Sequence, residues 1–138
     1  MAIDFGTKRI GLAVTDPLQM IASPLETVHP KDFDSFLREY MKKEEIEEFV
    51  IGYPVQMNNK PSESVKDLNP FIKRLRKNHP DKTVHLVDER FTSQMAMRAM
   101  IDGGLRKKER MDKSIVDRVS ASIILQSYLE KRANKREN

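Results

Sequence analysis

Three acidic segments of this sequence lie where a strand or a helix is otherwise apolar. Asp4 ends the first apolar run, just before Gly6. Asp88 and Glu89 end another run, and Asp117 lies at the margin of the apolar stripe of a C-terminal helical pattern. Carboxylates that converge in space repel one another unless a cation neutralises them. We therefore expect these acids to meet around Mg²⁺ or Mn²⁺.

Such a site is suited to the hydrolysis of phosphodiester bonds. Two hard cations can activate a water molecule and stabilise the leaving oxygen during attack at phosphorus. Zinc is disfavoured, because the chain has no cysteine and its histidines show no ligand spacing. Basic residues near the acids are candidate phosphate contacts. They are Lys8, Arg9, Arg90, Arg106, Lys107, Lys108, Arg110 and Lys113.

Each acid also has a purely structural interpretation. Asp4 could support its own turn, and either acid of the 88–89 pair could form a surface ion pair with Arg90. Ser114 and Asp117 have the spacing of a capping box at a helix start. Since side chains alternate across a strand, only one residue of the 88–89 pair can face a given site.

The hydrophobic pattern predicts an α/β fold in which these acids approach one sheet edge. Strands are expected at 2–5, 10–16, 21–28 (with Pro24 at a bulge or edge), 48–53 and 83–88, and helices at 32–43 (capped by Asp32), 64–78, 92–101 and 114–131. Pro70 either kinks the second helix or starts a new one. We predict a five-stranded mixed sheet, a three-strand meander plus two crossover strands, with helices on both faces.

Length and composition narrow the class of protein. The 138 residues suit one domain, 1–138, with a disordered tail over 133–138. The absence of cysteine and of a long apolar run predicts a soluble, cytoplasmic protein with no membrane partner. The net charge of +4 and the pI near 9.3 fit a polyanionic partner.

Four segments in order resemble the YqgF family, also called RuvX-like. They are AIDFGTKRIGLAV (2–14), VIGYP (50–54), VDERFTS (87–93) and KSIVDRVSASIILQSYL (113–129). The resemblance covers essentially the whole chain. It implies an RNase H-like fold and a metal-dependent nuclease, with a role either in maturation of the 5′ end of pre-16S rRNA or in Holliday junction resolution.

The family's acids correspond here to Asp4, the Asp-Glu-Arg segment and Asp117. Within that segment we favour Glu89 and keep Asp88 as the alternate ligand. The catalytic and metal-binding set implied is therefore Asp4, Glu89 and Asp117. The nucleic-acid partner would be pre-rRNA or branched DNA.

Two other functional classes fit parts of the sequence. The Asp-x-Gly-Thr segment also resembles the phosphate loop of actin-like kinases and chaperone ATPases, but that fold needs two such domains. A non-catalytic nucleic-acid-binding module would use the acids as helix caps and the basic segment for phosphate. A resolvase would need a symmetric dimer, and no dimer interface is recognisable; we expect a monomer or a weak homodimer, and favour rRNA processing.

Overall fold

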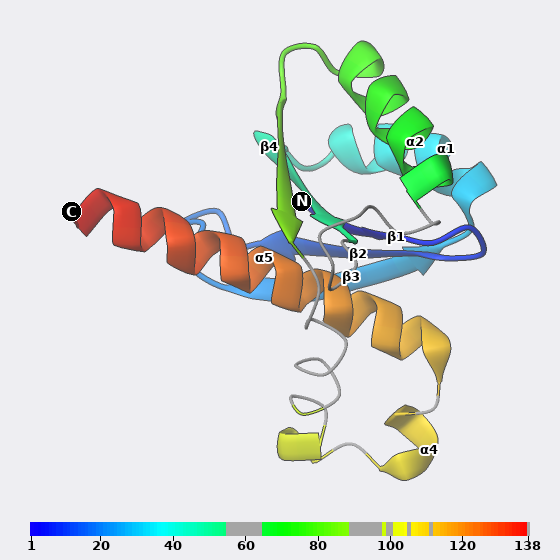
Figure 1. Cartoon of the computed structure of the whole chain (residues 1–138), viewed down its shortest axis with the longest axis vertical. Coiled ribbons are helices and arrows are strands. Elements are labelled where there is room, and N and C mark those ends of the chain that lie inside the picture. Colours follow the sequence, from blue (N-terminus) through cyan, green and yellow to red (C-terminus); the bar gives the residue numbers. More distant parts are fainter. Residues whose placement is uncertain (55–64, 89–97, 99–100, 105, 111, 138) are drawn as a thin grey trace.

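The computed structural model of the chain describes residues 1–54, 65–88, 98, 101–104, 106–110 and 112–137 (Figure 1). One mixed sheet has the strand order β3-β2-β1-β4-β5. Its antiparallel part is the meander of β1 (Ala2–Phe5), β2 (Ile10–Thr15) and β3 (Ala22–Val28). Its parallel part adds β4 (Glu48–Tyr53) beside β1 and β5 (Thr83–Asp88) beside β4.

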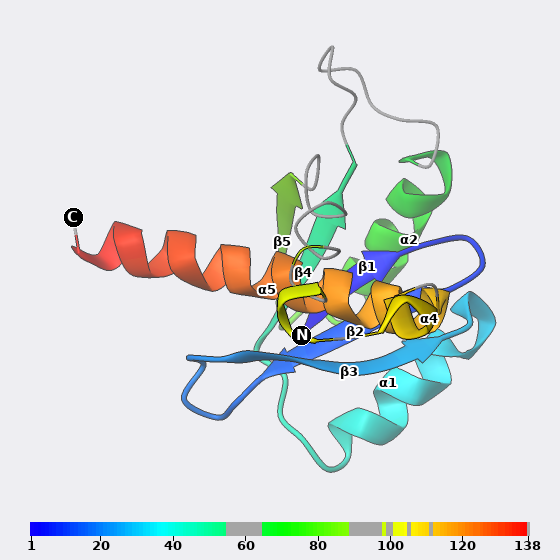
Figure 2. The ribbon, with the colours of Figure 1, turned by 90° about the horizontal axis from the view of Figure 1, so that it is seen from below.

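Helices cover both faces of this sheet. They are the 3-10 turn η1 (Pro30–Asp32), α1 (Phe33–Met41), α2 (Val65–Asn78), the short α4 (Lys107–Arg110) and the long α5 (Lys113–Glu137). In Figure 1, α1 and α2 lie above the sheet and α5 lies below it. In Figure 2, α5 crosses the sheet and its C-terminal end extends beyond the strands.

Each face carries its own core, because successive side chains of a strand point to opposite sides. Ile3, Ile10 and Leu12 are buried in the core under α1 and α2. Ala2 and Ala13 are buried in the core under α5. We call these sides of the sheet the α1/α2 face and the α5 face.

The predicted fold class is confirmed, and all five predicted strands agree with the observed bounds to within one residue. β1, β4 and β5 begin and end at the predicted residues. β3 is an edge strand in which Pro24 pairs with Ala13, beside an irregularity of register between Leu12 and Ala13. A proline fits there because an edge strand has one side that needs no ladder hydrogen bond.

Two helix predictions need correction. Asp32 precedes α1 but forms no side-chain capping bond, because its backbone (φ −98°, ψ −5°) is not the extended conformation that a capping residue needs. The preceding turn is capped instead by His29, whose Nδ1 accepts from the Lys31 N–H at 3.1 Å. Pro70 does not start a new helix, since it lies inside the continuous α2.

The C-terminal third also differs from the expectation. Part of the basic segment predicted as a loop over 106–113 forms α4, and α5 continues through 133–137, where a frayed tail was expected. The predicted helix over 92–101 lies mostly outside the described residues, but Gly104 has the positive φ (82°) expected at its predicted end. No helix in the described ranges combines the length and apolarity needed to cross a membrane.

Candidate functional site

Asp4 lies at the carboxyl end of β1, on the α5 face. It pairs across the ladder with Gly11 of β2, and directly opposed residues of an antiparallel pair point to the same side of a sheet. Ala2, two residues earlier on the strand, is buried against α5. The carboxylate of Asp4 therefore extends from the sheet toward the helix that carries Asp117.

Gly11 brings the two acids together. A Cβ atom added at Gly11 would overlap the backbone carbonyl of Asp117 and lie 3.0 Å from the Asp117 Cβ. The α5 backbone thus rests directly on β2, beside Asp4. Since opposed Cβ positions are about 5 Å apart, the Cβ atoms of Asp4 and Asp117 are separated by less than about 9 Å.

This separation suits two carboxylates on one ion. A carboxylate oxygen lies about 2.4 Å from its Cβ, and Mg²⁺–oxygen bonds are about 2.1 Å. The pair can therefore share a hard cation without movement of the backbone. Among the described residues no three His, Asp or Glu side chains are grouped closely enough to hold a metal ion, and Glu89 lies outside those residues.

Arg9 is the present partner of the Asp117 carboxylate. Its Nε donates to Oδ2 of Asp117 at 2.7 Å, and the two side chains are 38% and 20% exposed. We expected Arg9 to contact phosphate, and the sequence carried no signal for this pairing with a residue 108 positions away. The ion pair neutralises one of the converging carboxylates, as a cation would.

The start of α5 is fixed by residues other than Asp117. Oδ1 of Asp112 accepts from both the N–H and the hydroxyl of Ser114, at 3.0 and 2.7 Å. The Ser114 hydroxyl, followed by its backbone N–H, lowers the pKa of Asp112 below its usual 3.8. The alternative interpretation of Ser114 and Asp117 as a capping box is therefore excluded, because Ser114 bonds to Asp112 and Asp117 bonds to Arg9.

A second contact ties the start of α5 to the edge of the sheet. The Thr27 hydroxyl in β3 donates to the backbone carbonyl of Ser114 at 2.6 Å. Thr27 pairs with Gly11, which in turn pairs with Asp4. The laterally paired residues Asp4, Gly11 and Thr27 therefore lie under the start of α5, and the contacts of Gly11 and Thr27 with the helix fix its position relative to Asp4.

Asp88 lies on the other face from Asp4. It pairs with Tyr53, whose hydroxyl donates to Asn69 of α2 at 3.0 Å. The residue before Asp88, Val87, is buried in the core under α5. Alternation along β5 thus directs Asp88 to the α1/α2 face, which counts against it as the alternate ligand beside Asp4.

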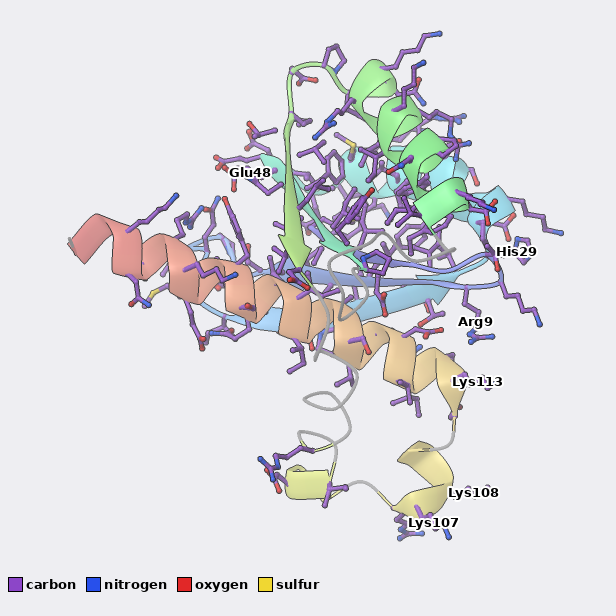
Figure 3. The ribbon with its side chains drawn as sticks, viewed as in Figure 1. Arg9, His29, Glu48, Lys107, Lys108 and Lys113 are labelled. Atoms are coloured by element: carbon purple, nitrogen blue, oxygen red, sulfur yellow. The ribbon has the colours of Figure 1, made fainter. Side chains whose placement is uncertain are left out.

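Most of the basic residues predicted to contact phosphate belong to the described part of the structure. Arg9 and Lys113 lie at the same end of the molecule, with Lys107 and Lys108 of α4 beyond them (Figure 3). Lys8, Arg106, Lys107, Lys108 and Lys113 are exposed. Arg90 and the Arg110 side chain lie outside what the structure describes. The exposed cations gather at the end of the sheet that carries Asp4.

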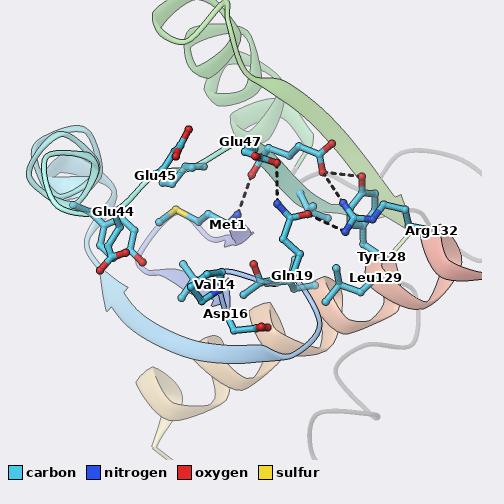
Figure 4. Close-up of a pocket in the computed structure, with 17 residues that line it drawn as sticks. Met1, Val14, Asp16, Gln19, Glu44, Glu45, Glu47, Tyr128, Leu129 and Arg132 are labelled. Carbon is cyan, nitrogen blue, oxygen red and sulfur yellow. Dashed lines mark hydrogen bonds and ion pairs between the residues drawn. The ribbon is translucent and has the colours of Figure 1, made fainter.

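A cavity of about 240 Å³ lies at the opposite end of the sheet, between the start of β4 and the second half of α5 (Figure 4). Glu48 accepts from Tyr128 at 3.0 Å and lies 3.6 Å from Arg132, which donates to Gln19 at 2.9 Å. Glu47 accepts from Gln19 at 2.8 Å. These bonds fix the far half of α5, and neither Asp4 nor Asp117 lines the cavity.

Known proteins resemble this chain over nearly its whole length. The family model described as "RuvX: Holliday junction resolvase" matches residues 1–131. The chain is 53% identical to a protein of Phocaeicola vulgatus and 51% identical to one of Bacteroides fragilis, each over 94% of both chains. It is 48% identical to a protein of Flavobacterium psychrophilum over 96% of both chains. All three carry the name "Putative pre-16S rRNA nuclease". With a match over nearly its whole length, the chain belongs to the RuvX family.

Proposed function

We propose that this protein is a single-domain, metal-dependent endonuclease that cleaves pre-16S rRNA during maturation of its 5′ end. The observation that carries the proposal is the approach of Asp117 to Asp4 through the bare backbone of Gly11. Two carboxylates at that separation are within reach of one hard cation, which would neutralise both. The names of relatives about half identical in sequence support RNA as the substrate.

Asp4, Glu89 and Asp117 would hold the metal. Their oxygen ligands suit Mg²⁺ or Mn²⁺. When bound, such ions supply an activated water and stabilise the charge that develops on the leaving oxygen. The carboxylates fix the position of the ions, and the backbone contact at Gly11 fixes the carboxylate of Asp117.

The exposed cations at the same end would position the substrate. Lys8, Lys107, Lys108 and Lys113 can contact phosphates on either side of the cleaved bond without reading sequence. Arg9 would exchange Asp117 for a phosphate when a metal ion takes over the neutralisation of that carboxylate. We further propose that the protein works in the cytoplasm, as a monomer or a weak homodimer.

Cleavage of a pre-16S rRNA fragment by wild type and by Asp4→Asn, in Mg²⁺ and in Mn²⁺, tests the proposal. Loss of one catalytic carboxylate is expected to lower kcat at least a hundredfold, on the scale of other charge-stabilising groups in active sites. Asp81→Asn, at an exposed turn, is the matched control and should cleave as wild type does. Equal cleavage by both variants would refute the assigned role of Asp4. Binding without cleavage by wild type would indicate a non-catalytic module.

Resolution of four-way DNA junctions is a second candidate, favoured by the description of the family model. The same acids would serve both reactions, so the two differ only in substrate. Parallel assays of a four-way junction and the rRNA fragment separate them. Paired cuts in the junction, with an intact rRNA fragment, would replace the rRNA proposal.

A further inference from the structure

A hollow of about 360 Å³ lies between α2 and the edge strand β5, on the α1/α2 face. It is lined by Tyr53, Asn69, Ile72, Lys73, Arg76 and Leu86. None of these residues belongs to the proposed catalytic set. The hollow combines an apolar floor with a cationic rim, which is the composition of a site for a ring attached to an anionic group.

The floor of the hollow is held in place. Leu86 is 46% exposed although it belongs to a strand. Tyr53 packs against the core of this face and its hydroxyl donates to Asn69 at 3.0 Å. A fixed aromatic ring beside an exposed aliphatic side chain offers a surface on which a planar base can stack.

The rim is positively charged, and its charges are available. Arg74, on the same helix, is already engaged, because it lies 3.5 Å from Asp34 and over the ring of Phe71. Lys73 and Arg76 are exposed, and in the described part of the chain neither forms an ion pair. Of these three cations of α2, Arg74 contacts α1, and Lys73 and Arg76 line the hollow.

Strand register places the hollow at the same sheet edge as the catalytic acids. Ile3 pairs with Ile51 of β4, so that Asp4 is level with Gly52, the residue before Tyr53. Asp4 faces α5 and Tyr53 faces α2. The route we propose for the substrate chain runs from the catalytic face over this end of the sheet to the hollow.

We propose that the hollow binds a single-stranded segment of the substrate that flanks the cleaved bond. One base stacks on Tyr53 and Leu86, and the adjoining phosphates contact Lys73 and Arg76. Single strands are favoured over duplex because a base must be unstacked from its neighbours to reach the floor. The proposal rests on the nuclease function and adds to it a substrate feature, an unpaired flank.

Binding measurements without divalent metal test the subsite independently of catalysis. Fluorescence anisotropy would compare a blunt duplex with the same duplex carrying a single-stranded tail, in RNA and DNA versions. The tail is expected to raise the affinity of wild type about tenfold. The double variant Lys73→Glu/Arg76→Glu should lose this gain and bind the blunt duplex as before, with a salt slope on the tailed substrate lower by about 1.4.

Three controls make the result specific. Lys43→Glu removes a charge from an exposed site outside the hollow and should keep the gain, as should Lys73→Arg. Tyr53→Phe retains the ring but loses the bond to Asn69 and should keep most of the gain, whereas Tyr53→Leu should lose most of it. A gain confined to the RNA or the DNA tail identifies the strand that the site accepts.

Equal affinity of wild type for tailed and blunt substrates would overturn the subsite. So would an equal loss on both substrates in the double variant, since that outcome indicates general electrostatics. Either result leaves cleavage by wild type and its loss in Asp4→Asn unaffected. Failure of the nuclease proposal would instead appear as absent cleavage alongside intact tail binding.

Discussion

At the scale of single residues, the site depends on which charge neutralises Asp117. In the structure this charge is the Arg9 guanidinium, 2.7 Å away and partly shielded from solvent. A divalent cation that binds Asp117 must compete with this contact. The ion pair therefore both pre-positions the carboxylate and opposes metal binding.

Arg9→Ala should tighten Mn²⁺ binding severalfold, because the competing cation is gone, and weaken RNA binding, because a phosphate contact is lost. Mn²⁺ titration followed by electron paramagnetic resonance gives the first quantity, and anisotropy gives the second. Arg9→Lys, which keeps the charge, should lie between the two proteins. Unchanged Mn²⁺ affinity in Arg9→Ala would contradict the competition.

At the scale of elements, the two ends of α5 are fixed by different interactions. Asp112 and Thr27 hold its start beside the acids. Tyr128 and Arg132 hold its second half through Glu48 and Gln19. The cap at Asp112 depends on pH, because the bonds from Ser114 favour the ionised carboxylate and lower its pKa.

Asp112→Ala should lower the melting temperature above about pH 4 and have little effect at lower pH. The folded-state pKa of Asp112 is depressed, so its contribution is present above the usual value of 3.8 and disappears as the pH falls through the folded-state pKa. Thermal unfolding from pH 3 to pH 7 measures this difference. The difference should narrow as the pH falls below 3.8, and a difference as large at pH 3 as at pH 7 would exclude the cap as its cause.

Elements formed by interactions between neighbouring residues could be predicted from the sequence, and contacts between distant segments could not. The apolar runs in 48–53 and 83–88 are local patterns, and they predicted β4 and β5 correctly. Asp32 was wrongly predicted to cap α1, because it also ends the 3-10 turn η1, which the residue types around it do not reveal. The Arg9–Asp117 pair and the Gly11 contact join distant segments, so no local pattern could reveal them. Gly11 within an apolar strand was the one available signal, since such glycines often mark a close backbone approach.

At the scale of the whole molecule, the two ends of the sheet differ in the charged groups beside them. Lys107, Lys108 and Lys113 lie toward one end together with Arg9 (Figure 3), and Lys8 lies in the turn between β1 and β2. The cavity at the other end is bordered by Asp16, Glu44, Glu45, Glu47 and Glu48, with Arg132 among them. Lys131 and Lys135 are exposed on the part of α5 that follows the cavity, so the acids disfavour a polyanion at the cavity itself and not over the whole of that end.

Reversing two acids at the far end, Glu44→Lys/Glu45→Lys, should create a competing site for RNA. Affinity at low salt is expected to rise, with a steeper salt dependence, while kcat stays unchanged because the added binding is remote from the acids. Anisotropy over a salt series and single-turnover cleavage measure the two effects. Glu44→Gln/Glu45→Gln should show a smaller rise in affinity. A parallel increase in kcat would contradict the claim that RNA bound at this end is remote from the catalytic acids.

The contact at Gly11 has a consequence for how the protein tolerates mutation. Main chain lies against main chain there, so backbone atoms and no side chain set the closest approach of α5 to the sheet. Core substitutions that leave this contact in place are expected to lower the fraction of folded molecules more than the turnover of each folded molecule. Substitution of Gly11 itself is not tolerated in this way, since any larger residue would lift the helix and separate the acids.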